Sequence, residues 1–259
     1  MSELTPAQQL RYSAQLLLPE MDESQQLRLL HSKVLIIGLG GLGSVVASYL
    51  AGAGVGHLLL ADDDRVSLSN LPRQLLYSSA GVGQLKVDAA TARLQAQNPE
   101  LVITPLAARL TLSDLLALLP EVNLVLDCTD NASSRLAINQ ACFLRQVPLI
   151  SGAASGWQGQ LLALQPWLGQ GCYQCLYPDW QDSPSCLAGG MLGPMVGTIA
   201  CQQALLALKH LLQIGDVPFG RLHCFNGLHG QSCQLQLQQD PACPICGAGD
   251  SWPYSTQFD

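Results

Sequence analysis

A run of branched aliphatic residues leads directly into a glycine-rich loop near the start of the chain. Residues 33–44 read KVLIIGLGGLGS, and Gly38, Gly40 and Gly43 match the pattern G-x-G-x-x-G. When such a loop follows a buried strand and opens a helix, its backbone N–H groups and the helix dipole can receive a phosphate. The stretch therefore predicts a βαβ unit that binds a nucleotide.

The same stretch is apolar enough to be mistaken for a membrane helix. It carries no Asp, Glu, Lys or Arg between Val34 and Ala61, but it contains seven glycines, which do not suit a membrane-spanning helix. A strand over 34–38, a helix over Ser44 to Ala53 and a strand over 57–61 account for it better, with charge resuming where the second strand ends. We therefore expect no contact with a membrane.

Alternating apolar patterns along the rest of the chain predict an α/β fold. Polar helices are expected within residues 1–30, interrupted near Pro19. A doubly wound, Rossmann-like parallel sheet follows, with further strands over 101–106, 123–130 and 147–152 and helices over 83–99, 112–120 and 131–145. Strands over 159–166, 220–226 and 232–238 predict an antiparallel extension, and a long apolar helix covers 197–214.

Charge and local motifs exclude several classes of function. The 259 residues include 12 Lys and Arg against 19 Asp and Glu, a net charge of −7, whereas a protein that binds duplex nucleic acid needs a basic face. The five histidines fall in no H-E-x-x-H or triad-like pattern, so nothing favours a hydrolase. The N-terminus has no basic segment followed by an apolar core, and we expect a cytoplasmic protein that binds a small nucleotide.

The identity of the nucleotide depends on residues beyond the loop. Asp62 follows Gly43 by nineteen residues, at the end of the second strand, where it can accept a hydrogen bond from a ribose hydroxyl. This arrangement fits NAD, FAD and ATP equally, so an NAD- or FAD-dependent oxidoreductase is an alternative. Such an enzyme does not need Asn70, Arg73, Lys86 and Asp130 together.

Three segments favour ATP: DDDRVSLSNLPRQ (62–74), GVGQLKVDAA (81–90) and DCTDN (127–131). Together they resemble the E1-like adenylyltransferase family, which includes ThiF and MoeB, and the resemblance extends over about residues 10–247. It implies that the chain uses ATP to adenylylate the C-terminal glycine carboxylate of a small ubiquitin-like sulfur carrier that ends in Gly-Gly. The segments LLLADDDRVSLSNL and GCYQCLYPD resemble the members that act on ThiS in thiamine thiazole synthesis. The small subunit of molybdopterin synthase is the alternative carrier.

The chemistry of these positions can be argued without the family. A C-terminal carboxylate, with a pKa of about 3.5, is ionised at neutral pH and needs no general base. Its attack on the α-phosphate requires positive charge and a metal ion, because catalysis of such transfers is mainly positioning and electrostatic stabilisation. Lys86 and Arg73 can supply the charge, Asn70 can donate a hydrogen bond to a phosphate, and Asp130 can hold Mg²⁺. Asp130 and Asn131 could alternatively cap the next helix.

The resemblance adds further residues to this site. It implies that Asp62 and Asp64 lie near the ribose and the phosphates, and that Gly41 lets the backbone approach the α-phosphate. We take Arg73, Lys86, Asp130 and Cys186 as catalytic. The predicted nucleotide-binding residues are Gly38, Gly40, Gly41, Gly43, Asp62, Asp64, Asn70, Arg73, Lys86, Asp130, Asn131 and Arg11.

Four of the ten cysteines form two C-x-x-C pairs. Cys172 and Cys175 are separated by 67 residues from Cys243 and Cys246, and four thiolates suit a closed structural zinc site, although a single C-x-x-C could be a redox pair. Zinc removal is expected to cost folding rather than the adenylation chemistry. The resemblance implies that the isolated Cys186 joins covalently to the activated carrier during sulfur transfer, which involves a sulfur donor protein. The remaining cysteines are expected in the core: Cys128, Cys142, Cys201, Cys224 and Cys233.

Two positions depart from the family pattern. In the N-terminal segment RYSAQ, Arg11 is present but Ala14 replaces an arginine that in family homodimers reaches the partner subunit's nucleotide, and Pro72 replaces a glutamine. Ala14 makes a non-catalytic E1-like partner protein a further alternative. The expected architecture is one adenylation domain over 1–250, with N-terminal helices over 1–30, a nucleotide-binding half over 31–153, a carrier-binding and zinc half over 154–250, and a flexible tail over 251–259.

Overall fold

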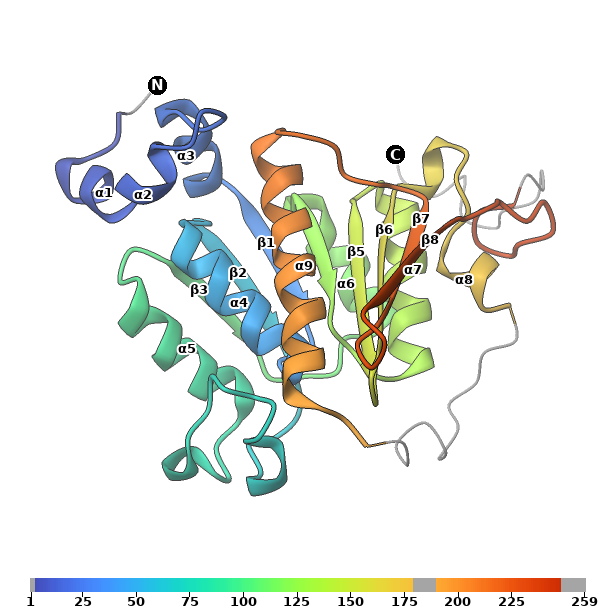
Figure 1. Cartoon of the computed structure of the whole chain (residues 1–259), viewed down its shortest axis with the longest axis horizontal. Coiled ribbons are helices and arrows are strands. Elements are labelled where there is room, and N and C mark those ends of the chain that lie inside the picture. The colour runs from blue at the N-terminus through green and yellow to red at the C-terminus, as the bar shows by residue number, and fades with distance from the viewer. Residues whose placement is uncertain (1–2, 179–189, 248–259) are drawn as a thin grey trace.

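The glycine-rich loop follows a central strand of a mixed sheet (Figure 1). A computed structural model describes residues 3–178 and 190–247. The strands in this part of the chain are β1 (Lys33–Ile37), β2 (His57–Ala61), β3 (Val102–Leu106), β4 (Leu124–Asp127), β5 (Leu149–Ser155), β6 (Gln158–Leu164), β7 (Arg221–Asn226) and β8 (Gln231–Gln236). They form one sheet in the order β3-β2-β1-β4-β5-β6-β7-β8. Neighbours from β3 to β5 are parallel and those from β5 to β8 antiparallel, which confirms the predicted sheet and its extension.

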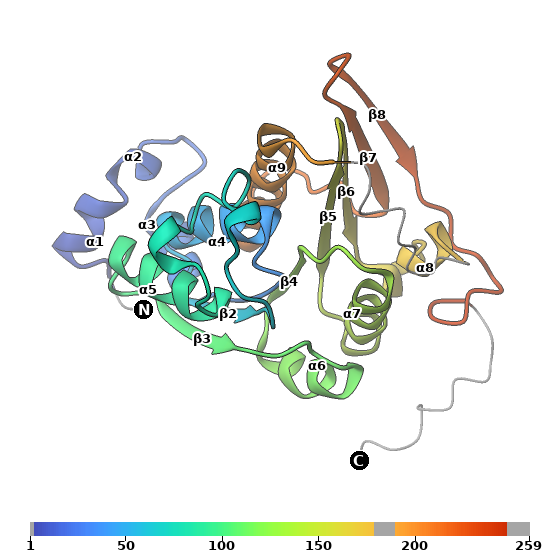
Figure 2. The ribbon, with the colours of Figure 1, turned by 90° about the horizontal axis from the view of Figure 1, so that it is seen from below.

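Helices cover both faces of this sheet (Figures 1 and 2). The helices of the described residues are α1 (Pro6–Arg11), α2 (Ser13–Leu16), α3 (Glu23–Leu30), α4 (Gly41–Ala53), α5 (Lys86–Gln97), α6 (Leu112–Leu118), α7 (Ala132–Arg145), α8 (Tyr173–Leu176) and α9 (Gly193–Leu212), with 3₁₀ turns η1 (Leu68–Asn70), η2 (Ser79–Gly81), η3 (Leu119–Glu121) and η4 (Pro166–Leu168). α3, α4, α5 and α9 contribute to the core on one face, and α6, α7 and α8 to the core on the other. This two-sided cover explains why the central strands are apolar throughout.

The long helix α9 is a core helix of this fold. By length and composition it could cross a membrane, but half of its most apolar window is buried. Ile199, Ala200 and Ala207 lie in the core against the sheet and α4. The apolar character of α9 is therefore accounted for by packing within the protein.

Some element boundaries differ from those predicted. Helix α4 begins at Gly41 rather than Ser44, because Gly40 is already its N-cap and the glycines continue the helix without steric hindrance. Its C-terminal end is predicted correctly, where Gly54 adopts φ +93° and closes the helix. The predicted junction between the two halves, after residue 153, falls inside β5.

Candidate active site

The loops after β1 and β4 meet at the carboxyl edge of the sheet. These strands are neighbours, and β1 continues to β2 on its other side while β4 continues to β5, so the crevice between them is a topological switch point. Gly38 has φ +87°, and a Cβ there would lie only 2.7 Å from the Cys128 carbonyl oxygen. The first glycine of the motif is therefore required for contact between the two loops.

The other glycines of the loop have separate structural roles. A Cβ at Gly43 would lie 1.8 Å from the Gly38 carbonyl oxygen, so Gly43 lets α4 pack onto its own loop. Gly40 caps α4 without a side-chain hydrogen bond, which leaves the first-turn N–H groups for an anion. A Cβ at Gly41 would lie 2.7 Å from Val196 Cγ1 of α9, so packing accounts for this glycine; its approach to a phosphate stays a prediction.

Asp62 connects the end of β2 to the glycine loop. Its carboxylate accepts hydrogen bonds from Leu39 N at 2.6 Å and from Asp64 N at 2.8 Å. Burial raises the pKa of Asp62, whereas the nearby Lys86 ammonium opposes that shift. Lys86 is itself buried, with Nζ 2.8 Å from Asp64 and 3.9 Å from Asp62. The predicted ribose-binding and phosphate-binding residues thus form one charged group.

Two clefts adjoin at the loop after β4. The first brings together six predicted nucleotide-binding residues: Gly38, Gly40, Asp62, Asp64, Asp130 and Asn131. The second lies toward the antiparallel strands and α8, and it is lined by Gly41, Arg73, Ala153, Tyr173 and Tyr177 among others. Both clefts share Cys128, Thr129 and Asp130. The acidic side chain of Asp130 therefore stands at their junction.

The two residues of the Asp130-Asn131 pair have different surroundings. Asn131 caps α7 by accepting a hydrogen bond from Ser134 N at 2.9 Å, so the capping alternative is correct for this residue. Asp130 is exposed, and within residues 3–178 and 190–247 its carboxylate has no hydrogen bond or ion pair. A free carboxylate facing both clefts fits the oxygen ligands that Mg²⁺ prefers.

Six predicted nucleotide-binding residues do not line the first cleft: Gly41, Gly43, Asn70, Arg73, Lys86 and Arg11. Asn70 ends η1, and its carbonyl oxygen accepts hydrogen bonds from Arg73 N and Gln74 N. Arg73 lines the second cleft, and its guanidinium donates to the Ser69 carbonyl oxygen at 3.0 Å. Lys86 reaches the site through Asp62 and Asp64. Gly43 lies in the first turn of α4, against the Gly38 carbonyl oxygen.

Arg11 lines neither of the two clefts. The Arg11 guanidinium donates to the Gln97 carbonyl oxygen at 3.1 Å, at the last residue of α5, whereas Lys86 is the first. With a rise of about 1.5 Å per residue, the two ends of α5 are separated by about 17 Å. Arg11 therefore lies away from the clefts of its own chain, and Cys186 lies outside the described residues.

Sequence reasoning missed three residues near the clefts. Arg109 lines the first cleft, 4.0 Å from Asp63, and its position just after a strand was the signal for it. Arg135 and Tyr173 line the second cleft and contact each other, with 3.3 Å between Arg135 Nη1 and the Tyr173 hydroxyl. A charged residue at a buried position of α7 was the only signal for Arg135.

The four cysteines of the C-x-x-C pairs meet in one cluster. The Sγ–Sγ distances are 3.7 Å for Cys172–Cys243, 3.9 Å for Cys172–Cys175 and 3.3 Å for Cys175–Cys246. A tetrahedral zinc with Zn–S bonds of about 2.3 Å places its sulfurs about 3.8 Å apart, so the cluster is consistent with zinc. Hydrogen bonding from Cys246 lowers the pKa of Cys172 to about 5, which favours a thiolate.

The remaining cysteines do not all belong to the core. Cys128 and Cys142 are buried as predicted, and Cys224 is half-buried. Cys201 and Cys233 are exposed, so the prediction that they are core residues is wrong. Cys201 lies on the outer side of α9, and Cys233 lies on the edge strand β8, whose residues are all exposed.

Comparisons with known proteins show the family to which the chain belongs. The ThiF family model matches residues 12–245. The sulfur carrier protein ThiS adenylyltransferase of Escherichia coli (strain K12) is 45% identical over 245 residues, which cover 94% of this chain and 97% of the relative. The molybdopterin-synthase adenylyltransferase of the same organism is 42% identical over 248 residues, covering 95% and 100%. The chain therefore belongs to the ThiF family and is an adenylyltransferase.

A solved structure supports the fold independently. Escherichia coli MccB, in a crystal structure with ATP, superposes with a TM-score of 0.80 at 22% sequence identity. The match covers 92% of this chain and 73% of that chain. At this level of identity the likeness concerns the fold.

Proposed function

We propose that this chain uses ATP to adenylylate the C-terminal glycine carboxylate of a sulfur carrier protein and releases pyrophosphate. The observation that carries the proposal is the junction of two clefts at Asp130, beside the open N-terminus of α4. The first cleft has acidic residues suited to ribose and metal, with Lys86 next to them. The second is lined by small and aromatic residues that suit an extended peptide, and by Arg73, which suits its terminal carboxylate.

The residues of the junction have distinct roles in this reaction. The carrier carboxylate is ionised and attacks without a base, so the protein must hold two anions together. The α4 N-terminus and Lys86 bind and orient the phosphates, and Arg73 lies where it can offset the charge of the incoming carboxylate. Asp130 would hold Mg²⁺, which supplies charge neutralisation at the phosphates.

The carrier we propose is ThiS, which would place the chain in thiamine thiazole synthesis. The support is the ThiS adenylyltransferase at 45% identity and the resemblance of residues 58–71. The molybdopterin-synthase relative, at 42%, makes that enzyme's small subunit the second candidate. Purified protein with Mg–ATP and each carrier should form the adenylate of one carrier preferentially, read by intact mass. The same measurement would reveal an adduct on Cys186.

The metal role of Asp130 has a direct test. Asp130→Ala should abolish carrier-dependent ATP–pyrophosphate exchange. The matched control is Asp88→Ala, which removes an exposed carboxylate of α5 outside both clefts and should keep the exchange rate. Near-normal exchange by Asp130→Ala would overturn the assignment.

We also propose that the enzyme is a homodimer in which Arg11 serves the partner subunit's nucleotide. The support is the position of Arg11 at the far end of α5 from Lys86. Arg11→Ala and Asp130→Ala should each be inactive, but mixing them should restore activity, because the mixed dimer contains one site with both wild-type residues. If Arg11 acts within its own chain, the mixture stays inactive.

A further inference from the structure

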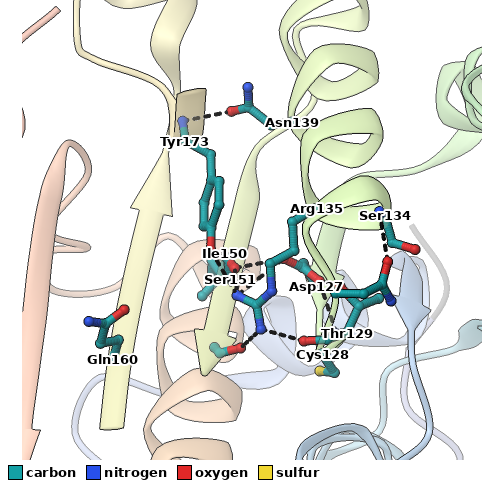
Figure 3. A network of polar contacts seen from close by, with 12 residues as sticks. Asp127, Cys128, Thr129, Ser134, Arg135, Asn139, Ile150, Ser151, Gln160 and Tyr173 are labelled. Atoms are coloured by element: carbon teal, nitrogen blue, oxygen red, sulfur yellow. Dashed lines mark hydrogen bonds and ion pairs between the residues drawn. The ribbon is translucent and has the colours of Figure 1, made fainter. Parts of the chain in front are cut away.

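A buried polar network joins Tyr173 of α8 to Thr129, in the loop that leads into Asp130 (Figure 3). Its centre is Arg135 of α7, which is 4% exposed. The guanidinium donates to the carbonyl oxygens of Thr129 and Gly152, to Ser151 Oγ at 3.1 Å and to the Tyr173 hydroxyl at 3.3 Å. One side chain thus connects β5, α8 and the loop after β4.

On the side of the active site, this network holds Thr129 by three of its atoms. The Asp127 carboxylate accepts hydrogen bonds from Thr129 N at 3.0 Å and from Thr129 Oγ1 at 2.7 Å. Arg135 Nη2 donates to the Thr129 carbonyl oxygen, which belongs to the peptide that leads into Asp130. Asp127 is held in turn by Ser151 Oγ at 2.7 Å and lies 3.8 Å from Arg135. The position of Asp130 therefore depends on Arg135.

On the other side, the network reaches the cysteine cluster through Tyr173. This residue lies between Cys172 and Cys175 in the chain, so the conformation of that segment sets where its hydroxyl lies. Its backbone N–H donates to Asn139 Oδ1 of α7 at 2.9 Å, which fixes the segment against the same helix that carries Arg135. Tyr173 is buried, and no other aromatic hydroxyl in the described residues contacts Arg135.

We propose that Arg135 is a positioning residue that couples the four-cysteine cluster to Asp130, with Tyr173 as the link. The inference rests on the proposed magnesium role of Asp130. It changes the expectation drawn from the sequence, because metal loss at the cluster would then weaken magnesium-dependent nucleotide binding as well as folding. A hydrogen bond to a charged donor in a buried site is strong enough for this coupling to be measured.

The test is nucleotide affinity with and without magnesium, measured by calorimetry with a non-hydrolysable ATP analogue and no carrier. Tyr173→Phe keeps the ring and removes only the hydroxyl that contacts Arg135. It should raise the Kd in magnesium about tenfold, given the usual strength of such a bond, and leave the Kd in magnesium-free buffer unchanged. Tyr12→Phe is the matched control, since its buried hydroxyl lies outside both clefts and accepts a hydrogen bond from Asn98 Nδ2 at 3.2 Å, and its magnesium dependence should equal that of the wild type.

Chelation of the cluster metal provides the second arm of the test. Stripping zinc from the wild type should reproduce the Tyr173→Phe effect, whereas stripping it from Tyr173→Phe should add little, because the link is already broken. Arg135→Lys, which keeps a positive charge beside Asp127, should show a larger loss than Tyr173→Phe. Thermal unfolding and zinc content show that each variant is folded and loaded beforehand.

Asp130→Ala separates the two ways in which this proposal can fail. It should lose the magnesium dependence itself. Suppose that Asp130→Ala loses the magnesium dependence of nucleotide affinity, while Tyr173→Phe and Arg135→Lys keep that of the wild type. The proposed coupling is then wrong, and the magnesium role of Asp130 stands. If Asp130→Ala retains the full magnesium dependence, the magnesium role of Asp130 is wrong and the coupling falls with it.

Discussion

Lys86 is the first residue of α5, and its ammonium group lies 2.8 Å from the Asp64 carboxylate. Asp64 is largely exposed, but Lys86 is buried and Asp62, 3.9 Å from it, is mostly covered. The Lys86 ammonium group therefore offsets the negative charge of the buried Asp62 carboxylate as well as that of the exposed Asp64 carboxylate. It also keeps a positive charge at the edge of a site that we expect to bind phosphates.

Lys86→Met should abolish catalysis and weaken the fold. Without the cation, Asp62 and Asp64 face each other uncompensated, and we expect a loss of about 1 to 3 kcal/mol in the free energy of unfolding. Carrier-dependent ATP–pyrophosphate exchange should fall by about 100-fold or more. Denaturant unfolding and exchange assays measure both.

Lys33→Met is the control for loss of a lysine. Lys33 pairs with Glu121 at 2.6 Å, and the Glu121 side chain is exposed. This surface pair should contribute under about 1 kcal/mol, and the exchange rate should not change. Equal behaviour of the two variants would contradict the role given to Lys86.

Two glycines of the loop should respond differently to alanine. At Gly43 a Cβ would lie 1.8 Å from the Gly38 carbonyl oxygen, so Gly43→Ala should displace backbone and lower the melting temperature by several degrees. At Gly40 the nearest atom to a Cβ is Gln74 Nε2 at 3.5 Å, an ordinary contact, so Gly40→Ala should fold normally. Its effect should appear only as weaker nucleotide binding. An unstable Gly40→Ala together with a stable Gly43→Ala would refute this division.

The nucleotide side of the site was predictable because its residues follow from local patterns. Asp62 comes directly after β2 and Asp130 lies three residues beyond the end of β4, and the carboxyl ends of parallel strands share one edge of a sheet. The glycine spacing indicated the turn, although the start of α4 was placed three residues late because glycines are poor helix formers in isolation.

The rest of the site depends on contacts between distant segments. The Val196 side chain leaves no room for a Cβ at position 41, and Tyr173 contacts Arg135 although they are 38 residues apart in the sequence. No local periodicity of the sequence encodes either contact. The error at Cys201 and Cys233 has a related cause. An apolar pattern indicates a helix or strand, but it does not tell which of its faces another element covers.

Acidification should destabilise the protein through His210. Burial lowers the pKa of this histidine below its ordinary value of 6.5. As the pH falls, the unfolded chain binds this proton before the folded protein does. The contribution of neutral His210 to the free energy of unfolding is therefore fully present above pH 6.5 and is lost as the pH falls through the lower pKa of the folded state. His210→Gln should therefore flatten the fall in the free energy of unfolding between pH 6.5 and pH 5. His229→Gln, in an exposed turn, should leave the slope as in the wild type, and a steeper slope in His210→Gln would contradict the assignment.

Thiol labelling should distinguish the exposed from the buried cysteines. Cys233 on β8 and Cys201 on α9 are exposed, whereas Cys128 and Cys142 are buried, and burial raises the pKa of both buried thiols. Because the thiolate is the reactive form, iodoacetamide at neutral pH should modify Cys233 and Cys201 in the native, zinc-loaded protein. Cys128 and Cys142 should react only after unfolding. Peptide mass spectrometry at successive times measures each site separately, and labelling of Cys128 as fast as that of Cys233 would show that the loop after β4 opens in the native state.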